Sequence, residues 1–504
     1  MPIDLDSYRQ AAEAFVGSLE REYYLHLAGH KTELEIEPIY ARHGWLFDRE
    51  VVGDLREAAA GADGEERRRL RYLLSFALDG CLGCASQREA EETAKLEATL
   101  AVETERGTVG YRQVPIEQAN EPDAARRAEL EAARDQLLVE RLNPLHLAAL
   151  ERSHQLCREL GWSGYADAYA DVRGLDLAAL AEQTRAFLRA TDDAYPLLVD
   201  PRLAAAGLPP LGELARSDVS RFFRAPELDA DFPASSLVGS LDATLGALGV
   251  DLRSQGNVHL DTEPRASKDP RAFCSPVLVP GEVYLVIAPV GGRDDYGALF
   301  HEAGHTEHYA NVTEALPFEF RHLGDNSVTE SFAFLFENMT EDPLWLQDHL
   351  GLDDAAATVA QGRAARLVLL RRYAAKLAYE LDLHAASPDL ARMPARYSQL
   401  LGSATRIEWP QAAWASDVDP GFYVACYLRA WALETHWRAE LRQRFGERWF
   451  ASAEAGEWLR RLWAHGQRLD ADELLAQELG IDLDFGVMAR ELMESPGVCS
   501  AASE

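Results

Sequence analysis

The chain has 504 residues, 47% of them hydrophobic, and carries 50 Lys and Arg against 83 Asp and Glu, a formal net charge of −33. This acidic balance disfavours nucleic acid as a partner, because its phosphates would be repelled. No apolar run approaches the roughly 20 residues of a membrane span, and no Pro-, Gly- or Ser-rich linker or internal repeat marks a domain boundary. We therefore expect one large, mostly helical protein without membrane contact. If charge steers its substrates, it favours cationic peptides.

The N-terminus and the cysteines indicate a cytoplasmic location. Residues 1–6 are acidic and lack a basic stretch followed by an apolar one, so no signal peptide is expected. Six cysteines in 504 residues suit reduced thiols better than a disulfide framework. Cys81 and Cys84 form a lone CxxC without a second pair, so a separate metal or redox role for them is a minor alternative.

Amphipathic helices dominate the first 200 residues. Residues 7–28 carry apolar side chains at four-residue spacing. Pro122–Leu142, Pro144–Leu160 and Asp176–Tyr195 are rich in helix-forming residues, and we expect a break between the first two at Asn143-Pro144. These segments predict an array of helical hairpins in an N-terminal region of residues 1–205, without a catalytic constellation.

The pattern changes near residue 255. Residues 256–261 and 276–289 are rich in β-branched side chains, and Pro280-Gly281 marks a turn inside the second stretch. We expect a small antiparallel sheet here. An edge strand of this sheet could pair with an extended peptide, although a purely structural hairpin is equally compatible with the pattern.

The most informative segment is His301-Glu302-Ala303-Gly304-His305, which has the pattern HExxH. Positions four apart share one face of a helix, so both histidines can bind one Zn²⁺ while Glu302 lies beside the metal as a general base. An acidic start at Arg293-Asp294-Asp295 and apolar neighbours favour a helix at this place.

A catalytic zinc takes a third protein ligand, which must come from elsewhere in the chain. The metzincin pattern is excluded, because the residues that follow His305 do not supply its glycine and third histidine. The acidic candidates downstream are Glu307, Glu314, Glu319, Asp325, Glu330 and Glu337. The first two lie too near the motif to fold back. Residues 326–329 suggest a cap before a helix that opens at Glu330, which makes Glu330 the best third ligand.

Glu337 lies two helical turns beyond Glu330 on the same face. From there its carboxylate could hydrogen-bond a ligand histidine and orient it. A solvated helix carboxylate is an equally good interpretation of the same spacing.

Four blocks of sequence carry a family resemblance. Asp261–Cys274 ends in Arg-Ala-Phe-Cys, Phe300–His305 reads Phe-His-Glu-Ala-Gly-His, Glu330 and Glu337 follow on one helix, and residues 466–482 contain Gly466, Glu-Leu-Leu and Gly-Ile-Asp. In this order they resemble the thimet oligopeptidase and oligoendopeptidase F family of zinc metallopeptidases, of gluzincin type. That family has glycine where Arg271 stands. The resemblance covers residues 255–490 best.

The resemblance implies a mostly α fold: a two-lobed helical body with a small antiparallel sheet beside the zinc helix and a deep substrate channel. It implies one Zn²⁺ per chain, bound by His301, His305 and Glu330, and short peptides as substrates. We assign residues 206–495 to this catalytic region and expect residues 496–504 to form a disordered tail.

The resemblance also implies hydrogen-bond donors for the oxyanion of the tetrahedral intermediate. Residues 417–427 resemble the family's Pro-Phe-Tyr-Val-Tyr-x-Tyr run, and Tyr427 and Tyr423 match tyrosines in it, with Tyr427 the first choice. Core packing is an equally good explanation of either tyrosine. Two departures stand out: Ala425 replaces a tyrosine of the run, and the family's upstream histidine is missing.

The leading hypothesis is a zinc endopeptidase acting on short unfolded peptides. A metallocarboxypeptidase of related helical fold is an alternative, and it would need a basic residue for the substrate's terminal carboxylate, for which Arg406 and Arg429 are candidates. A catalytically weakened, zinc-containing peptide-binding protein is another. The sequence leaves peptide preference and oligomeric state open.

Overall fold

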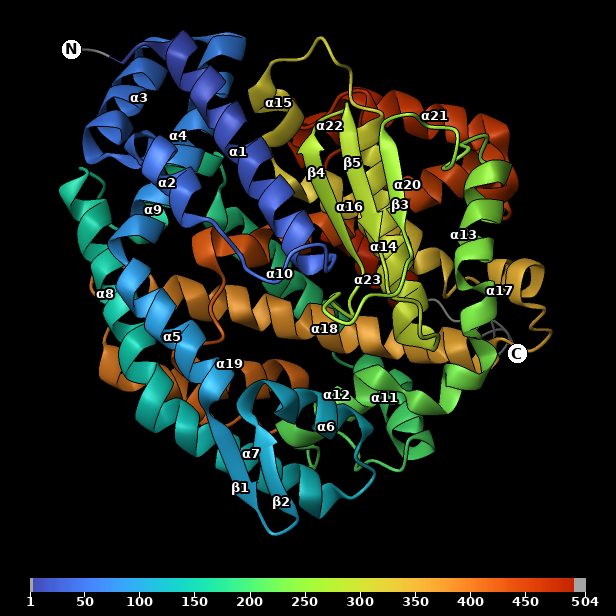
Figure 1. Ribbon diagram of the computed structural model, residues 1–504. Helices are drawn as coiled ribbons and strands as arrows, with labels where there is room; N and C mark the ends of the chain where they lie inside the picture. The colour runs from blue at the N-terminus through green and yellow to red at the C-terminus, as the bar shows by residue number, and fades with distance from the viewer. Residues whose placement is uncertain (1–2, 494–504) are drawn as a thin grey trace. The chain divides into compact units, whose positions relative to one another are not determined.

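The computed structural model describes residues 3–493, and its secondary structure is almost entirely helical, with one two-stranded and one three-stranded sheet (Figure 1). The prediction of a mostly α protein is confirmed. No helix in this part of the chain is both long and apolar enough to cross a membrane. The predicted tail at residues 496–504 lies outside the described residues.

The chain divides into two compact units that interleave along the sequence. Unit 1 comprises residues 3–78, 228–359 and 429–484, and unit 2 the described residues between and after them. The boundary that the sequence predicts between residues 205 and 206 remains a prediction.

Unit 1 contains the HExxH motif. Its elements are α1 (Leu5–Leu27), α2 (Glu37–His43), α3 (Arg49–Gly61), α13 (Ala234–Ala247), β3 (Val258–Asp261), β4 (Phe273–Leu278), β5 (Glu282–Val286), α14 (Arg293–Ala310), α15 (Phe318–His322), α16 (Asn326–Met339), α17 (Pro343–Leu350), α21 (Ala453–Trp463) and α22 (Ala471–Leu479). The helices α4 (Gly64–Ala85), α18 (Ala356–Leu383) and α20 (Tyr423–Phe445) each contribute one end.

The sheet of unit 1 has the strand order β3-β5-β4. Strands β4 and β5 are antiparallel, with Cys274 opposite Leu285, as the turn at Pro280-Gly281 predicted. Strand β3, however, runs parallel to β5, so the expectation of a purely antiparallel sheet was wrong. The long connection from β3 to β4 lets β3 enter the sheet in this direction, and strand propensity alone carries no information about it.

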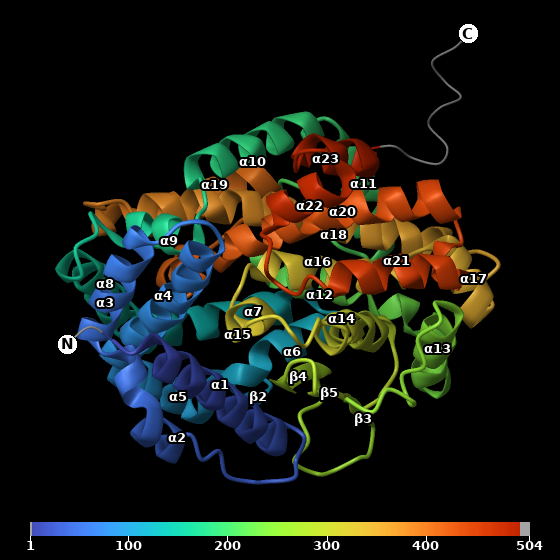
Figure 2. The ribbon, with the colours of Figure 1, turned by 90° about the horizontal axis from the view of Figure 1, so that it is seen from above.

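Helix α14 packs against β4 and β5, and α16 packs on α14 (Figure 2). Helix α1 contacts β4, so it covers part of that edge. A cross-section through unit 1 therefore passes from the sheet through α14 to α16. This order places the HExxH helix between a sheet and a largely buried helix, with α1 at the β4 edge.

Unit 2 is helical apart from one hairpin. Its elements are α5 (Gln87–Thr99), β1 (Ala101–Thr104), β2 (Gly107–Gly110), α6 (Val114–Asn120), α7 (Ala124–Leu137), α8 (Asn143–Glu159), α9 (Tyr165–Arg173), α10 (Leu177–Thr191), α11 (Ala194–Ala205), α12 (Arg216–Arg224), α19 (Met393–Thr405) and α23 (Phe485–Met493), with the remaining parts of α4, α18 and α20.

Two details of the N-terminal half differ from the prediction. The expected break at Asn143-Pro144 is absent, because a π-helical turn (Leu138–Leu142) joins α7 to α8 and Pro144 lies directly after this turn, in the first turn of α8. The β1–β2 hairpin was not predicted. Its strands have four residues each, and Val102 is held by tertiary packing on Val114 and Leu130.

Candidate metal centre

Helix α14 begins at a turn that fixes its direction. The carboxylate of Asp295 accepts hydrogen bonds from the backbone N–H groups of Val290 and Gly291, each at 2.7 Å. Gly291 and Gly292 both have φ of 91°, and a Cβ on Gly291 would lie 2.7 Å from the backbone nitrogen of Ala234. Only glycine fits this turn without strain, so the chain enters α14 in one defined orientation.

The glycine of the HExxH motif lets a second helix come close. A Cβ on Gly304 would lie 2.5 Å from the carbonyl oxygen of Phe332 and 2.6 Å from the Cα of Ala333. Helix α16 can therefore pack directly on α14 at this point. This contact places the first turns of α16 beside the two histidines.

The three predicted ligands converge. His301 Nε2 lies 3.5 Å and His305 Nε2 3.6 Å from Oε2 of Glu330. All three ligand atoms lie within 4.8 Å of one another. A tetrahedral metal with bonds of roughly 2.1 Å separates its ligands by about 3.4 Å, so the two distances fit a shared metal ion.

The second ring nitrogen of each histidine, Nδ1, lies within hydrogen-bond distance of a side chain on α16. His301 Nδ1 lies 2.9 Å from Oε2 of Glu337, and His305 Nδ1 lies 2.9 Å from the hydroxyl of Thr329. These hydrogen bonds turn both Nε2 atoms toward Glu330, the orientation that metal binding requires. The predicted contact between Glu337 and a motif histidine is confirmed.

The electrostatics of this cluster favour a cation. Burial opposes protonation of His301, but its hydrogen bonds to Glu330 and Glu337 outweigh burial and raise the pKa of His301 well above its usual value. Burial alone would raise the pKa of Glu330, yet the two histidines lower it strongly. Positive charge is thus stabilised at the centre of the cluster, whether a proton or a metal ion supplies it.

Glu302 is anchored to the sheet. The backbone N–H of Cys274 on β4 donates to Oε2 of Glu302 at 2.8 Å. Burial and the nearby charge of Glu302 raise the pKa of the Cys274 thiol well above its usual value, so this cysteine stays protonated. The carboxylate of Glu302 is therefore held beside the ligand cluster by the main chain.

The two predicted oxyanion donors belong to unit 2. Tyr423 and Tyr427 pack edge to face with ring centroids 4.9 Å apart, and Tyr427 also packs on Tyr373 at 5.6 Å. Gly421 and Phe422, just before them, both have positive φ, 61° and 55°. A left-handed phenylalanine is rare and marks a constrained turn at the start of α20.

The two arginines considered as carboxylate clamps are already engaged. Arg429 is 4% exposed and binds Asp325 and Asp472, each at 2.6 Å. In unit 2, Arg406 binds Asp192 at 3.0 Å. Each guanidinium therefore neutralises carboxylates of its own unit.

The roles of several residues of the centre were not predicted from the sequence. Helix α16 begins at Asn326 with Asp325 as its N-cap, so Glu330 lies one turn inside the helix and not at its start as expected. Asp325 accepts from the N–H of Ser327 at 3.0 Å, a local Asp-x-Ser signal that the sequence offered. Thr329 and the backbone of Cys274 carried no such signal, because their roles depend on tertiary contacts.

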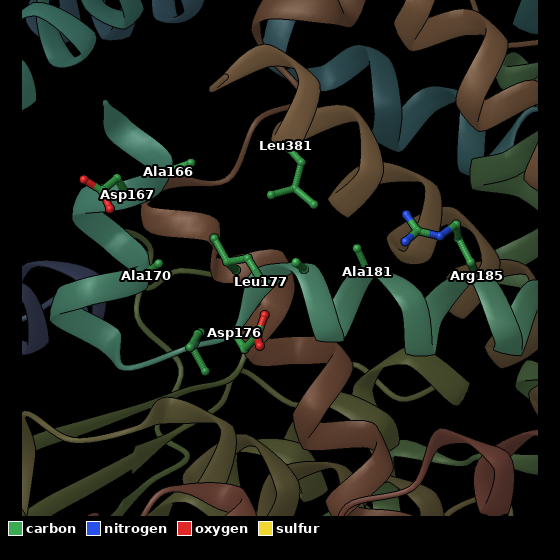
Figure 3. Close-up of a pocket in the computed structure, with 10 residues that line it drawn as sticks. Ala166, Asp167, Ala170, Asp176, Leu177, Ala181, Arg185 and Leu381 are labelled. Atoms are coloured by element: carbon green, nitrogen blue, oxygen red, sulfur yellow. The ribbon is translucent and has the colours of Figure 1, made fainter. Parts of the chain in front are cut away.

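A hollow of about 630 Å³ lies in unit 2, along α9, α10 and α18. Leu381 projects toward Leu177 across it, whereas Asp167 points away (Figure 3). Among residues 3–493, the one group of three or more side chains suited to hold a metal is the cluster at His301, and neither this hollow nor Cys81 and Cys84 contribute to it. Within the described residues, the candidate metal ligands therefore all lie in unit 1.

Comparison with models of known protein families and with curated proteins gives no match for this chain. The family resemblance of residues 255–490 therefore rests on the motifs themselves, and it stays a prediction.

Proposed function

We propose that the protein is a zinc-dependent oligopeptidase that hydrolyses internal bonds of short unfolded peptides. The observation that carries the proposal is the spacing of His301 Nε2 and His305 Nε2, 3.5 and 3.6 Å from Glu330 Oε2. The anchored carboxylate of Glu302 beside this cluster supports a hydrolytic role over a purely structural metal. We expect the protein to act in the cytoplasm.

The donor set suits zinc. Two imidazole nitrogens and one carboxylate oxygen are typical ligands of a catalytic Zn²⁺, with the fourth position left to water or substrate. Bound zinc would supply Lewis acidity, which polarises a peptide carbonyl and acidifies water. Glu337 and Thr329 would keep the two imidazoles in the tautomer and orientation that binding needs.

Glu302 would act as the general base. Its carboxylate would take a proton from the attacking water, and the same proton would then pass to the nitrogen of the leaving amine. The hydrogen bond from the N–H of Cys274 fixes one carboxylate oxygen, so the side chain need not reorient between the two transfers. Tyr427, and Tyr423 as second choice, would donate to the oxyanion, as the family resemblance implies.

The test is cleavage of a mixed peptide library with and without a chelator. We expect cleavage within short peptides that a chelator abolishes and added zinc restores. Glu302→Gln should retain zinc and lose turnover, and Glu330→Ala should lose zinc. Library peptides left intact by the zinc-loaded protein would refute the proposal, and full zinc occupancy in Glu330→Ala would exclude that ligand.

The same library decides the mode of cleavage. Peptides with amidated C-termini should be cleaved as well as those with free carboxylates, since Arg406 and Arg429 are already neutralised by aspartates. Loss of cleavage on amidation would instead support the carboxypeptidase alternative. Tight peptide binding without turnover would support the weakened, peptide-binding alternative.

A further inference from the structure

A carboxylate on α1 lies beside the candidate metal centre. The hydroxyl of Ser275 on β4 donates to the backbone oxygen of Glu20 at 3.1 Å and to its Oε2 at 3.2 Å. Ser275 directly follows Cys274, whose N–H holds Glu302. Glu20 and the proposed general base are therefore bound to adjacent residues of β4.

A second chain of contacts leads from the ligands to the same carboxylate. The ring of Tyr309 stacks on His305 with centroids 6.4 Å apart and on His322 at 5.9 Å. His322 Nε2 donates to the carbonyl oxygen of Pro276 on β4 at 3.0 Å, and both rings interact electrostatically with Glu20. Tyr309, His322 and Glu20 thus form a polar strip along the β4 edge that begins at the metal ligands.

Glu20 differs from its neighbours on α1 because no strong cation neutralises it. Glu13 pairs with Arg321 at 2.6 Å and Glu22 with Lys31 at 2.7 Å. Within residues 3–493, Glu20 forms no ion pair with a lysine or arginine, and the side chain that interacts electrostatically with its carboxylate and lowers its pKa is His322. Burial raises the pKa of Glu20, which means that its charge is incompletely compensated. Residue Glu20 as a whole is only partly buried.

We infer that Glu20 is a specificity residue that binds a cationic group of the peptide, an ammonium or a guanidinium, while the scissile bond is held at the metal centre. The inference rests on the proposed function. An ammonium or guanidinium would form a charge-assisted hydrogen bond with this carboxylate, which now accepts a hydrogen bond from Ser275. The cation is supplied either by a lysine or arginine side chain or by the substrate's free α-amino group.

The test uses labelled alanine-based heptapeptides with one lysine, or its uncharged isostere norleucine, at each position in turn. Each is made with a free and an acetylated N-terminus, which separates the two sources of the cation. For the wild-type protein we expect kcat/KM to be about tenfold higher for the cationic member of one pair. Glu20→Gln should abolish this preference, so that kcat/KM for the cationic peptide falls to that of its norleucine counterpart.

Glu13→Gln is the matched control, since it removes the same charge from the same helix two turns away. It should keep the preference. Long-range steering by the net charge is screened in about 0.5 M salt, whereas a direct contact persists, so the preference should survive there in the wild type. A preference that Glu20→Gln retains, or that Glu13→Gln loses equally, would overturn the inference.

A measurement of binding affinity separates a failure of this inference from a failure of the proposed function. Fluorescence anisotropy of the same peptides with zinc-loaded Glu302→Gln protein reports affinity without turnover. Tighter binding of the cationic peptide that disappears in the double variant Glu302→Gln, Glu20→Gln supports the inference even if the wild-type protein cleaves nothing. Equal affinity for the charged and uncharged peptides refutes it even if cleavage is efficient.

Discussion

The hydroxyl of Thr329 lies 2.9 Å from Nδ1 of His305, on the residue that directly precedes the proposed ligand Glu330. One turn of α16 thus supplies both a ligand and the hydrogen bond that orients another ligand. His301 receives the corresponding support from a carboxylate, Glu337. His301 is thus oriented by a carboxylate and His305 by a neutral hydroxyl. The hydroxyl of Thr329 is the weaker acceptor, so its removal is the more informative test.

Thr329→Val should weaken zinc binding by roughly tenfold, because it keeps the shape of the side chain and removes the hydrogen bond to His305. Zinc affinity measured by competition with a chelating dye checks this. Thr329→Ser keeps the hydroxyl and should bind zinc as the wild type does. If Val and Ser behave alike, the orientation of His305 does not depend on this bond.

Gly304→Ala should destabilise the protein by about 1–3 kcal/mol, because its Cβ would press on the backbone of α16 at Phe332 and Ala333. Thermal unfolding of the metal-free protein measures the effect, and zinc affinity should fall with it as the helices separate.

Gly297→Ala, on the same helix, is the control for that experiment. Its Cβ would meet only the Cγ of Glu337, at 3.9 Å, so it should raise the free energy of unfolding by about 0.5–1 kcal/mol through helix propensity. An unaltered stability of Gly304→Ala would mean that the close approach of α14 and α16 is not maintained by this glycine.

Those residues of the metal cluster that lie close together in the sequence could be predicted. His301, Glu302 and His305 share one helix, and their spacing alone places them together. Glu330 could be found because a catalytic zinc needs a third ligand and because α16 follows closely along the chain. Cys274 and Glu20 act through contacts across 28 and 255 residues, and no local pattern reports such contacts.

The same distinction between local and long-range contacts applies to the fold. Apolar residues at four-residue spacing predicted α1, helix-forming composition predicted α8 and most of α10, and an acidic start with apolar neighbours predicted α14, since these signals all lie within the helix itself. The parallel direction of β3 and the existence of β1 and β2 escaped prediction. Pairing direction depends on the connection, and four-residue strands carry too little pattern to detect.

Acid should destabilise unit 2 through a pair of buried histidines. His154 Nε2 lies 2.8 Å from Nδ1 of His384. Burial lowers the pKa of His154 to about 4, and it lowers the pKa of His384 well below its usual value. The unfolded chain takes up protons below about pH 6.5 while the native pair does not, so stability is full above that pH and falls as the pH drops toward 4.

The loss from His154 should be about 3 kcal/mol between these pH values, measured by urea unfolding at each pH. His154→Gln, which cannot be protonated, should flatten the dependence. A wild-type stability that does not change between pH 6.5 and 4 would contradict the neutral pair.

Arg429 should stabilise the helix that carries Glu330. Its guanidinium binds Asp325, the N-cap of α16, and Asp472 on α22. Burial alone would raise the pKa of Asp325, but Arg429 outweighs it, so the pKa lies below its usual value. The contribution of this pair is therefore present above about pH 4 and is lost as the pH falls further.

Arg429→Met should lower the free energy of unfolding by about 3–5 kcal/mol at neutral pH, because it leaves the buried Asp325 without its cation. Asp472→Asn is the control: Asp472 is 58% exposed, so losing it should cost less than about 1 kcal/mol. Urea unfolding of both variants gives the two values. Zinc affinity should fall in Arg429→Met and stay unchanged in Asp472→Asn, since only the first loosens the start of α16. Equal effects in the two variants would show that Arg429 joins α20 to α22 without positioning Glu330.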